Sequence, residues 1–219
     1  MEKDKISFLN KNEQFILENV LFLRQLIKQK KASPEDYHQL GISYFLIKNY
    51  EKSIDVLDEL LNKYPQYIDI NKIYKLKILC LLHLKKFKEA INLIQKRLYY
   101  NQQDISFLHM LAYAYEKLNQ YSEALKIHKK VLNLDPENPT SLNAYGYLLT
   151  LYGNPNTLPI AKQCFEKVLK KNPENPYYLD SYAMYLNKVG QKDQAREILL
   201  KALQKDPENT EILFHLKEI

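Results

Sequence analysis

Glycine and tryptophan are scarce in this chain of 219 residues, which has four glycines and no tryptophan. A turn-rich β protein needs many glycines, so the low glycine content argues against a sandwich or a barrel. Disorder is excluded on other grounds, because hydrophobic residues make up 46% of the sequence and include 18 tyrosines. The composition therefore predicts a folded, mostly helical protein.

Motifs for metal binding and catalysis are also missing. Cys80 and Cys164 lie in apolar helical patterns with no second cysteine or histidine at ligand spacing, which predicts neither a disulfide framework nor a zinc site. Phosphate-binding glycine loops, the HExxH zinc motif and the serine elbow of hydrolases are absent. We therefore expect no metal, no cofactor and no enzymatic activity.

Long apolar runs are absent too. No stretch approaches the roughly 18 uninterrupted apolar residues of a membrane span, so no transmembrane segment is expected. The first 31 residues are interrupted by charged and polar side chains and lack a small-residue cleavage site, unlike a secretory signal. We expect a cytoplasmic protein, or a periplasmic or membrane-attached one if a leader has been removed.

What the chain does contain is an internal repeat, whose detection decides the fold. One tetrapeptide recurs with little change at 135–138, 172–175 and 206–209, at offsets of 37 and 34 residues. Upstream runs a series of small residues at offsets of 37, 34, 37 and 34: Ser53, Ala90, Ala124, Ala161 and Ala195. Small residues at such positions allow two helix backbones to approach closely.

Each tetrapeptide ends one helix and begins the next. Asn138 and Asn175 precede prolines, and this pairs an N-cap with a proline at the first helical position. The segment 33–36 has the same pattern with acidic residues in the first turn. Apolar residues follow helical spacing on either side of a polar break at 119–120, so each repeat is predicted to be two antiparallel helices.

This pattern resembles the tetratricopeptide repeat, a helix pair with large, small and proline residues at set places. The first repeat matches at Tyr37, Leu40, Gly41, Tyr44, Tyr50, Ser53, Leu57 and Pro65. The fifth matches at Leu179, Tyr182, Ala183, Leu186, Ala195, Leu199, Ala202 and Pro207. The resemblance implies an all-α, right-handed superhelical α-solenoid of helix-turn-helix repeats. Its five repeats span about 34–67, 71–104, 105–138, 139–175 and 176–209, within an array at 33–209.

Three departures from the pattern qualify this description. The second repeat matches least well, with Ile78, Arg97 and Gln102 at places where the family has smaller residues or proline. Three extra residues lie around 67–70, and three more lengthen the turn at 152–159 inside the fourth repeat. Insertions of this kind are expected in loops.

Helical segments flank the array at both ends. Residues 1–32 form a predicted N-terminal helical segment, in which the helix at 13–31 is apolar on more than one stripe. It either caps the first repeat or exposes a surface for self-association or a partner. Residues 210–219 are predicted to form a C-terminal capping helix that covers the last repeat.

The resemblance implies a concave groove lined by the first helix of each repeat. Its predicted peptide-binding residues are His38, Ile42, Lys75, Leu79, His109, Tyr113, Asn143, Tyr147, Tyr177, Asp180 and Met184. Some family members grip the carboxylate tail of heat-shock chaperones with lysine, asparagine and arginine. The matching places here carry His38, Ile42, Leu76, Ser106 and Met110. A carboxylate-clamp chaperone tail is therefore not expected as the ligand.

The resemblance implies a non-catalytic scaffold or adaptor that binds a peptide or helix of an unidentified partner protein. Tyr113 and Tyr147 are the expected anchors, although these tyrosines could instead pack between repeats. One alternative is a chaperone of bacterial secretion or envelope assembly. Another is nucleic-acid binding along a lysine ridge at the ends of the second helices, which ranks below protein binding because no code residue recurs. The ridge comprises Lys96, Arg97, Lys129, Lys130, Lys170, Lys171, Lys201 and Lys205.

Overall fold

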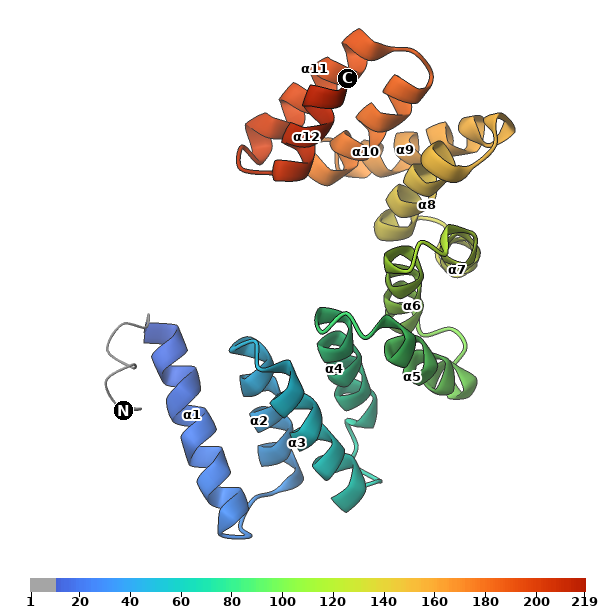
Figure 1. Ribbon diagram of the computed structural model, residues 1–219. Coiled ribbons are helices and arrows are strands. Elements are labelled where there is room, and N and C mark those ends of the chain that lie inside the picture. The colour runs from blue at the N-terminus through green and yellow to red at the C-terminus, as the bar shows by residue number, and fades with distance from the viewer. Residues whose placement is uncertain (1–10) are drawn as a thin grey trace. The chain divides into compact units, whose positions relative to one another are not determined.

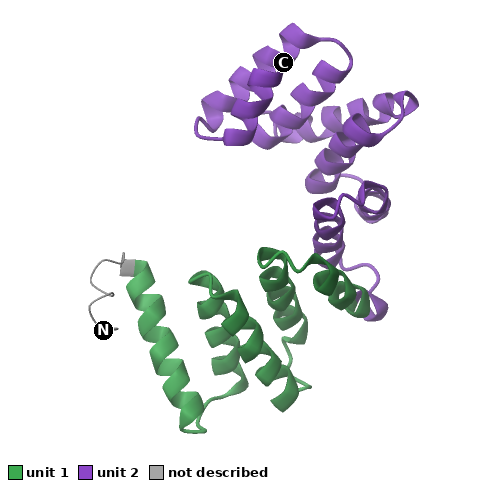
Figure 2. Cartoon of the chain, in the orientation of Figure 1, with its two compact units in different colours: residues 1–97 green, residues 98–219 purple. Residues whose placement is uncertain are grey.

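The computed structural model describes residues 11–219, and every regular element in that range is helical (Figure 1). The chain divides into two compact units, residues 1–97 and 98–219, and the division falls inside α5 (Figure 2). The first ten residues of the predicted N-terminal segment lie outside the described part. The prediction of an all-α fold built from helix pairs is confirmed.

The helices of the first unit, including the shared α5, are α1 (Lys11–Lys28), α2 (Pro34–Leu46), α3 (Tyr50–Lys63), α4 (Ile70–His83) and α5 (Phe87–Tyr100). Those of the second unit are α6 (Ile105–Lys117), α7 (Tyr121–Leu134), α8 (Pro139–Tyr152), η2 (Pro155–Thr157), α9 (Leu158–Lys171), α10 (Pro176–Lys188), α11 (Lys192–Lys205) and α12 (Thr210–Glu218). The short η2 occupies the lengthened turn inside the fourth predicted repeat.

The helix starts follow the predicted capping chemistry. Ser33 forms a capping box, in which its hydroxyl accepts from the Asp36 backbone N–H and the Asp36 carboxylate accepts from the Ser33 N–H at 2.8 Å. Asn138 accepts from the Ser141 N–H at 3.1 Å, and Asn175 from the N–H groups of the first turn of α10. These side chains satisfy backbone donors that have no partner inside the helix.

The turns inside most helix pairs use one residue in the left-handed region. That residue is Lys48 after α2, Lys85 after α4, Asn119 after α6 and Gly190 after α10. The following backbone N–H then bonds five residues back, as Gln191 does to the Leu186 carbonyl at 2.9 Å. The pair α8–α9 differs, because Gly153, the C-cap residue of α8, has a φ of −77° and the chain continues through η2. The extra residues thus replace a tight turn.

Close helix packing explains the small residues of the repeat. Ser53 donates to the Gly41 carbonyl at 2.7 Å. A Cβ at Gly41 would lie 2.6 Å from Cδ2 of the fully buried Leu57. In the second unit a Cβ at Gly146 would lie 3.0 Å from the Phe165 ring. The predicted close approaches of α2 with α3 and of α8 with α9 are therefore present.

The terminal helices bury part of their apolar surface. On α1, Val20 and Leu23 form a buried cluster with Leu40 and Tyr44 of the first repeat, whereas Phe15, Leu21 and Phe22 are exposed. On α12, Ile212 joins the buried cluster of α10 and α11, while Phe214 is exposed. Each end of the described chain therefore packs on its neighbouring repeat with one helix face and leaves apolar side chains exposed on another.

Candidate functional site

The predicted binding residues lie in both units. His38, Ile42, Lys75 and Leu79 belong to α2 and α4 of the first unit. The remaining residues belong to α6, α8 and α10 of the second unit: His109, Tyr113, Asn143, Tyr147, Tyr177, Asp180 and Met184. We call this second set the first-helix face.

Exposure varies widely among these residues. Tyr113 and Tyr177 are 44% and 58% exposed, so both rings are open to a ligand. His38 and Asp180 are buried, with 9% and 7% exposed. The others are half-buried: Ile42, Lys75, Leu79, His109, Asn143, Tyr147 and Met184. The exposed tyrosines are therefore the best placed to contact a ligand, whereas the buried His38 and Asp180 contribute to packing inside the protein.

In the first unit, His38 packs against an aromatic ring. Its imidazole lies edge-on to the Tyr67 ring, with centroids 6.0 Å apart. Burial lowers the pKa of His38, although Asp69 and Glu35 act in the opposite direction. His38 is therefore held as a neutral packing group beside the turn that leads into α4.

A chain of polar side chains joins the first two helices of the first-helix face. His109 Nε2 lies 3.1 Å from Ser141 Oγ, and the same hydroxyl lies 3.2 Å from His128 Nδ1. His128 Nε2 lies 3.0 Å from a Glu116 carboxylate oxygen. Ser141 is fully buried and cannot meet a substrate in this arrangement. His128 is thus a buried, hydrogen-bonded core histidine, and this chain of contacts stabilises the packing of α6, α7 and α8.

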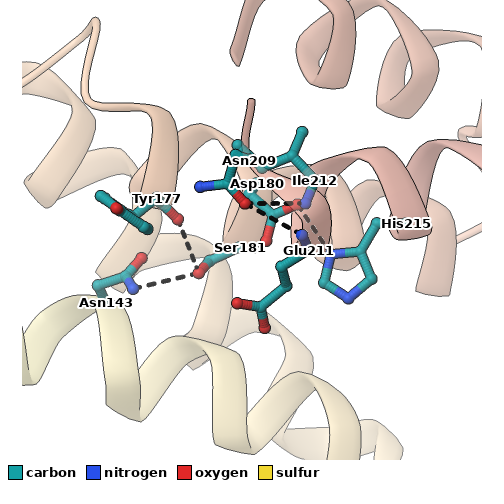
Figure 3. A network of polar contacts seen from close by, with 8 residues as sticks. All are labelled: Asn143, Tyr177, Asp180, Ser181, Asn209, Glu211, Ile212 and His215. Carbon is teal, nitrogen blue, oxygen red and sulfur yellow. Dashed lines mark hydrogen bonds and ion pairs between the residues drawn. The ribbon is translucent and has the colours of Figure 1, made fainter. Parts of the chain in front are cut away.

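A second polar network links α8 to α10 (Figure 3). The Asn143 carboxamide N–H donates to Ser181 Oγ at 3.1 Å, and the Ser181 hydroxyl donates to the Tyr177 carbonyl at 3.0 Å. Among the described residues, the buried Asn143 Oδ1 has no hydrogen-bond partner. An unpaired buried acceptor costs roughly 1–3 kcal/mol. This atom is therefore a point at which an added donor would stabilise the face.

The same view shows how α12 is attached. His215 Nδ1 lies 2.8 Å from Asp180 Oδ1, and both side chains are 10% exposed (Figure 3). The hydrogen bond that His215 donates to the Asp180 carboxylate raises the pKa of His215, burial opposes this, and the charge of Glu211 adds to the rise. Sequence reasoning missed His215. The sequence does contain a clue to it: His215 follows the apolar Ile212 by three residues, which places both side chains on the inward face of the predicted capping helix.

Tyr147 of the first-helix face lies on α8 and is half-buried. Burial, together with the charges of Glu211 and Asp180, raises the pKa of Tyr147 to about 12. The phenol is therefore neutral at physiological pH and remains a hydrogen-bond donor. On α6, the Lys117 ammonium lies 5.2 Å from the Tyr113 ring centroid, within the range of a cation–π contact.

Two lysines of the predicted ridge are engaged within the chain. Lys171 Nζ lies 2.9 Å from Glu137, and Lys205 Nζ lies 3.0 Å from Glu174. Both glutamates come from the recurring tetrapeptide, so each turn pairs with the end of the next second helix. These exposed pairs reduce the positive charge that the ridge offers to a phosphate backbone.

Residues 11–219 contain neither a membrane-spanning helix nor a metal-binding cluster. No helix there is long and apolar enough to cross a membrane. Within the same range, no three or more His, Cys, Asp or Glu side chains are grouped so that they could hold a metal ion.

Comparison with known sequences points to one repeat type. Residues 44–145 match the family described as Psidin, N-terminal TPR repeats region. The chain is 24% identical over 189 residues to anaphase-promoting complex subunit 3 of Schizosaccharomyces pombe. This alignment covers 84% of the chain but 27% of the relative, so the chain spans about a quarter of that protein's length.

Solved structures with the same fold agree. A tetratricopeptide repeat protein from Parabacteroides merdae superposes with a TM-score of 0.72 at 17% identity, covering 84% of this chain and 71% of that one. YrrB, a TPR protein with an unusual peptide-binding site, gives 0.63 at 19% identity, covering 90% and 98%. TTC0263 from Thermus thermophilus gives 0.64 at 16%, covering 85% and 98%.

Three observations indicate the same repeat architecture: the sequence repeat, the capped helix pairs and these matches. Arrays of this architecture serve in general as protein-interaction scaffolds, with protein or peptide partners. The chain has the fold of tetratricopeptide-repeat proteins.

Proposed function

We propose that this protein is a non-catalytic scaffold that binds an extended peptide segment of a partner protein on its first-helix face. Tyr113, Asn143, Tyr147 and Tyr177 supply the main contacts. In the first unit, the corresponding positions on α2 and α4 are Ile42, Lys75 and Leu79, and they form a further contact surface for the same kind of ligand.

The observation that carries the proposal is the combination of open tyrosine rings with an unsatisfied amide oxygen. Tyr113 on α6 and Tyr177 on α10 are exposed, in the third and fifth repeats, and tyrosine provides large contact area at low conformational cost. The half-buried Asn143 lies on α8, between these two helices in the chain, and its Oδ1 lacks a hydrogen-bond partner within the described residues. A backbone donor from an extended peptide matches that acceptor, whereas a helix has already used its own N–H groups.

Similar proteins support a peptide ligand by analogy. YrrB is described as having a peptide-binding site, and the fission yeast relative is by its name a subunit of a protein complex. Both relations extend to this chain only as a proposal, because fold alone does not determine function.

The test begins with a ligand selected on the full chain. A random peptide library displayed on phage is selected against the purified protein, and the best binder is labelled for fluorescence anisotropy. Tyr177→Ser and Asn143→Ala should each weaken binding by about tenfold or more, because buried aromatic and polar anchors dominate such interfaces.

The matched control is Tyr99→Ser, since Tyr99 is an exposed tyrosine of α5 outside the first-helix face. It should leave the affinity unchanged, and circular dichroism should show that all three variants stay folded. Equal affinities for the parent, Tyr177→Ser and Asn143→Ala would refute the assignment of the ligand to this face.

A further inference from the structure

A surface pocket lies between the second helices of two consecutive repeats. Its volume is about 310 Å³, and it is bounded by α7, α8, α9 and the turn before α8. Leu132, Leu142, Tyr145, Ile160 and Cys164 contribute apolar side chains to it. We call it the α7–α9 pocket. Pockets for drug-sized ligands run from roughly 300 to 1,000 Å³, so this one has room for a single large side chain.

The pocket is separate from the first-helix face. Leu142 and Tyr145 line it from α8, whereas Asn143 and Tyr147 of the same helix belong to the first-helix face. At 3.6 residues per turn, the two pairs point in directions roughly 150° apart. A ligand in the pocket therefore leaves the first-helix face free, and the two sites can be tested independently.

Two lysines border the pocket and form no ion pair within the described residues. They are Lys129 of α7 and Lys167 of α9, and both contribute to its lining. Neighbouring Lys171 is instead paired with Glu137. Burial raises the pKa of the Cys164 thiol in the pocket lining, and the positive charge of Lys167 opposes that rise. The positive charge is thus located beside the apolar surface.

Apolar surface at the mouth is open as well. Ile160 is 45% exposed, while Leu142 and Cys164 of the same lining belong to a buried cluster. Apolar surface flanked by unpaired ammonium groups is complementary to an apolar side chain with carboxylates beside it. A phosphate backbone would pair with the lysines but leave the apolar floor unfilled.

We propose that the α7–α9 pocket binds an acidic segment of a partner protein through one large apolar anchor. An aromatic or aliphatic side chain fills the space over Leu142 and Cys164. Carboxylates on either side of that anchor in the partner sequence pair with Lys129 and Lys167. This site is additional to the first-helix face and does not depend on it.

The probe is a fluorescein-labelled peptide, Gly-Ser-Asp-Glu-Phe-Glu-Asp-Ser-Gly, with anisotropy measured on the full chain at low and high ionic strength. The parent protein should bind it in a salt-sensitive manner. Replacing the central Phe by Ser, or the acidic residues by Lys, should weaken binding about tenfold or more, because both the anchor and its charges contribute.

Protein variants locate the site. Lys129→Glu combined with Lys167→Glu should lower affinity about tenfold or more. The control, Lys170→Glu with Lys201→Glu, makes the same change in net charge at exposed positions outside the pocket and should bind as the parent does. Ile160→Ser should weaken binding, whereas Tyr177→Ser on the first-helix face should not.

Three results would overturn the proposal. The first is an affinity that the two pocket lysine substitutions leave unchanged. The second is an equal loss in the control pair, which would show attraction to net charge only. The third is tighter binding of a mixed RNA oligonucleotide than of the peptide, with the RNA binding abolished by the same two lysine substitutions. Thermal melts of each variant exclude unfolding as the cause of any loss.

Discussion

The ion pair between His215 and Asp180 should make the attachment of α12 depend on pH. His215 Nδ1 and Asp180 Oδ1 are 2.8 Å apart, and each side chain is 10% exposed. The Asp180 hydrogen bond raises the pKa of His215, so the folded state binds the proton more tightly than the unfolded chain does. The stabilisation is therefore complete below the unfolded pKa of about 6.5 and is lost as pH rises through the folded pKa.

The magnitude follows from the kind of hydrogen bond. A hydrogen bond to a charged group contributes roughly 1.5–3 kcal/mol, and a neutral imidazole can still donate at roughly 0.5–1.5 kcal/mol. Deprotonation should therefore cost about 1–2 kcal/mol, which is a factor of about 5 to 30 in the opening equilibrium. Because α12 is terminal and short, this should appear as local opening rather than global unfolding.

Hydrogen exchange at the backbone amides of α12 measures that opening. After correction for the intrinsic pH dependence of exchange, protection at Leu213 and Leu216 should be greater at about pH 5.5 than at about pH 8.5, by the factor above. Asp180→Asn should abolish the pH dependence. The control is His83→Gln, which changes an exposed histidine of α4 and should leave it intact.

Equal protection of α12 at both pH values, or protection that increases with pH, would refute a stabilising role for the charged His215–Asp180 pair. The same holds for an Asp180→Asn variant with the parent's pH dependence. Equal protection at both pH values would mean that packing alone holds His215, and pH dependence kept by Asp180→Asn would mean that another group titrates.

Three further predictions concern stability and reactivity. Gly41→Ala should destabilise the chain in urea by about 1–2 kcal/mol, because the cost of overpacking against Leu57 exceeds the helix propensity gained; a more stable variant would disprove the close approach. Asn138→Ala should lower the free energy of unfolding by about 0.5–2 kcal/mol, because it removes the N-cap of α8. The control is Asn133→Ala at an exposed position, and equal stability of the two variants would contradict the prediction. Burial raises the pKa of Cys80 and Cys164, so both thiols should react with Ellman's reagent far more slowly in the native chain than in urea; equal rates would refute their burial.

The sequence predicted the helix pairs because their signals are local. The caps at Asn138 and Asn175 depend on side chains within a few residues of the helix start, and the structure contains both. The small residues at Gly41 and Ser53 similarly marked the helix contact that the structure contains. The left-handed residues Lys48 and Lys85 were not predicted, because lysine has no special preference for that conformation.

The predicted binding residues were harder to classify. Repeat position correctly identified which residues lie on the first helices, but it treated Tyr177 and Asp180 alike. The structure leaves Tyr177 exposed and buries Asp180 against His215, which lies 35 residues further along the chain. That contact depends on how α12 packs on α10, so no local pattern contains it.

By itself, then, the sequence determined the repeat, the helix boundaries near each cap and the absence of enzyme motifs, since these follow from short-range chemistry and periodicity. Only the tertiary structure decided which tyrosines are open, which lysines are paired and where the α7–α9 pocket lies. Those properties depend on side chains from different repeats meeting in space, as Lys129 and Lys167 do at the pocket. Spacing along the chain predicts that repeats stack, but it does not predict which side chains the stacking covers.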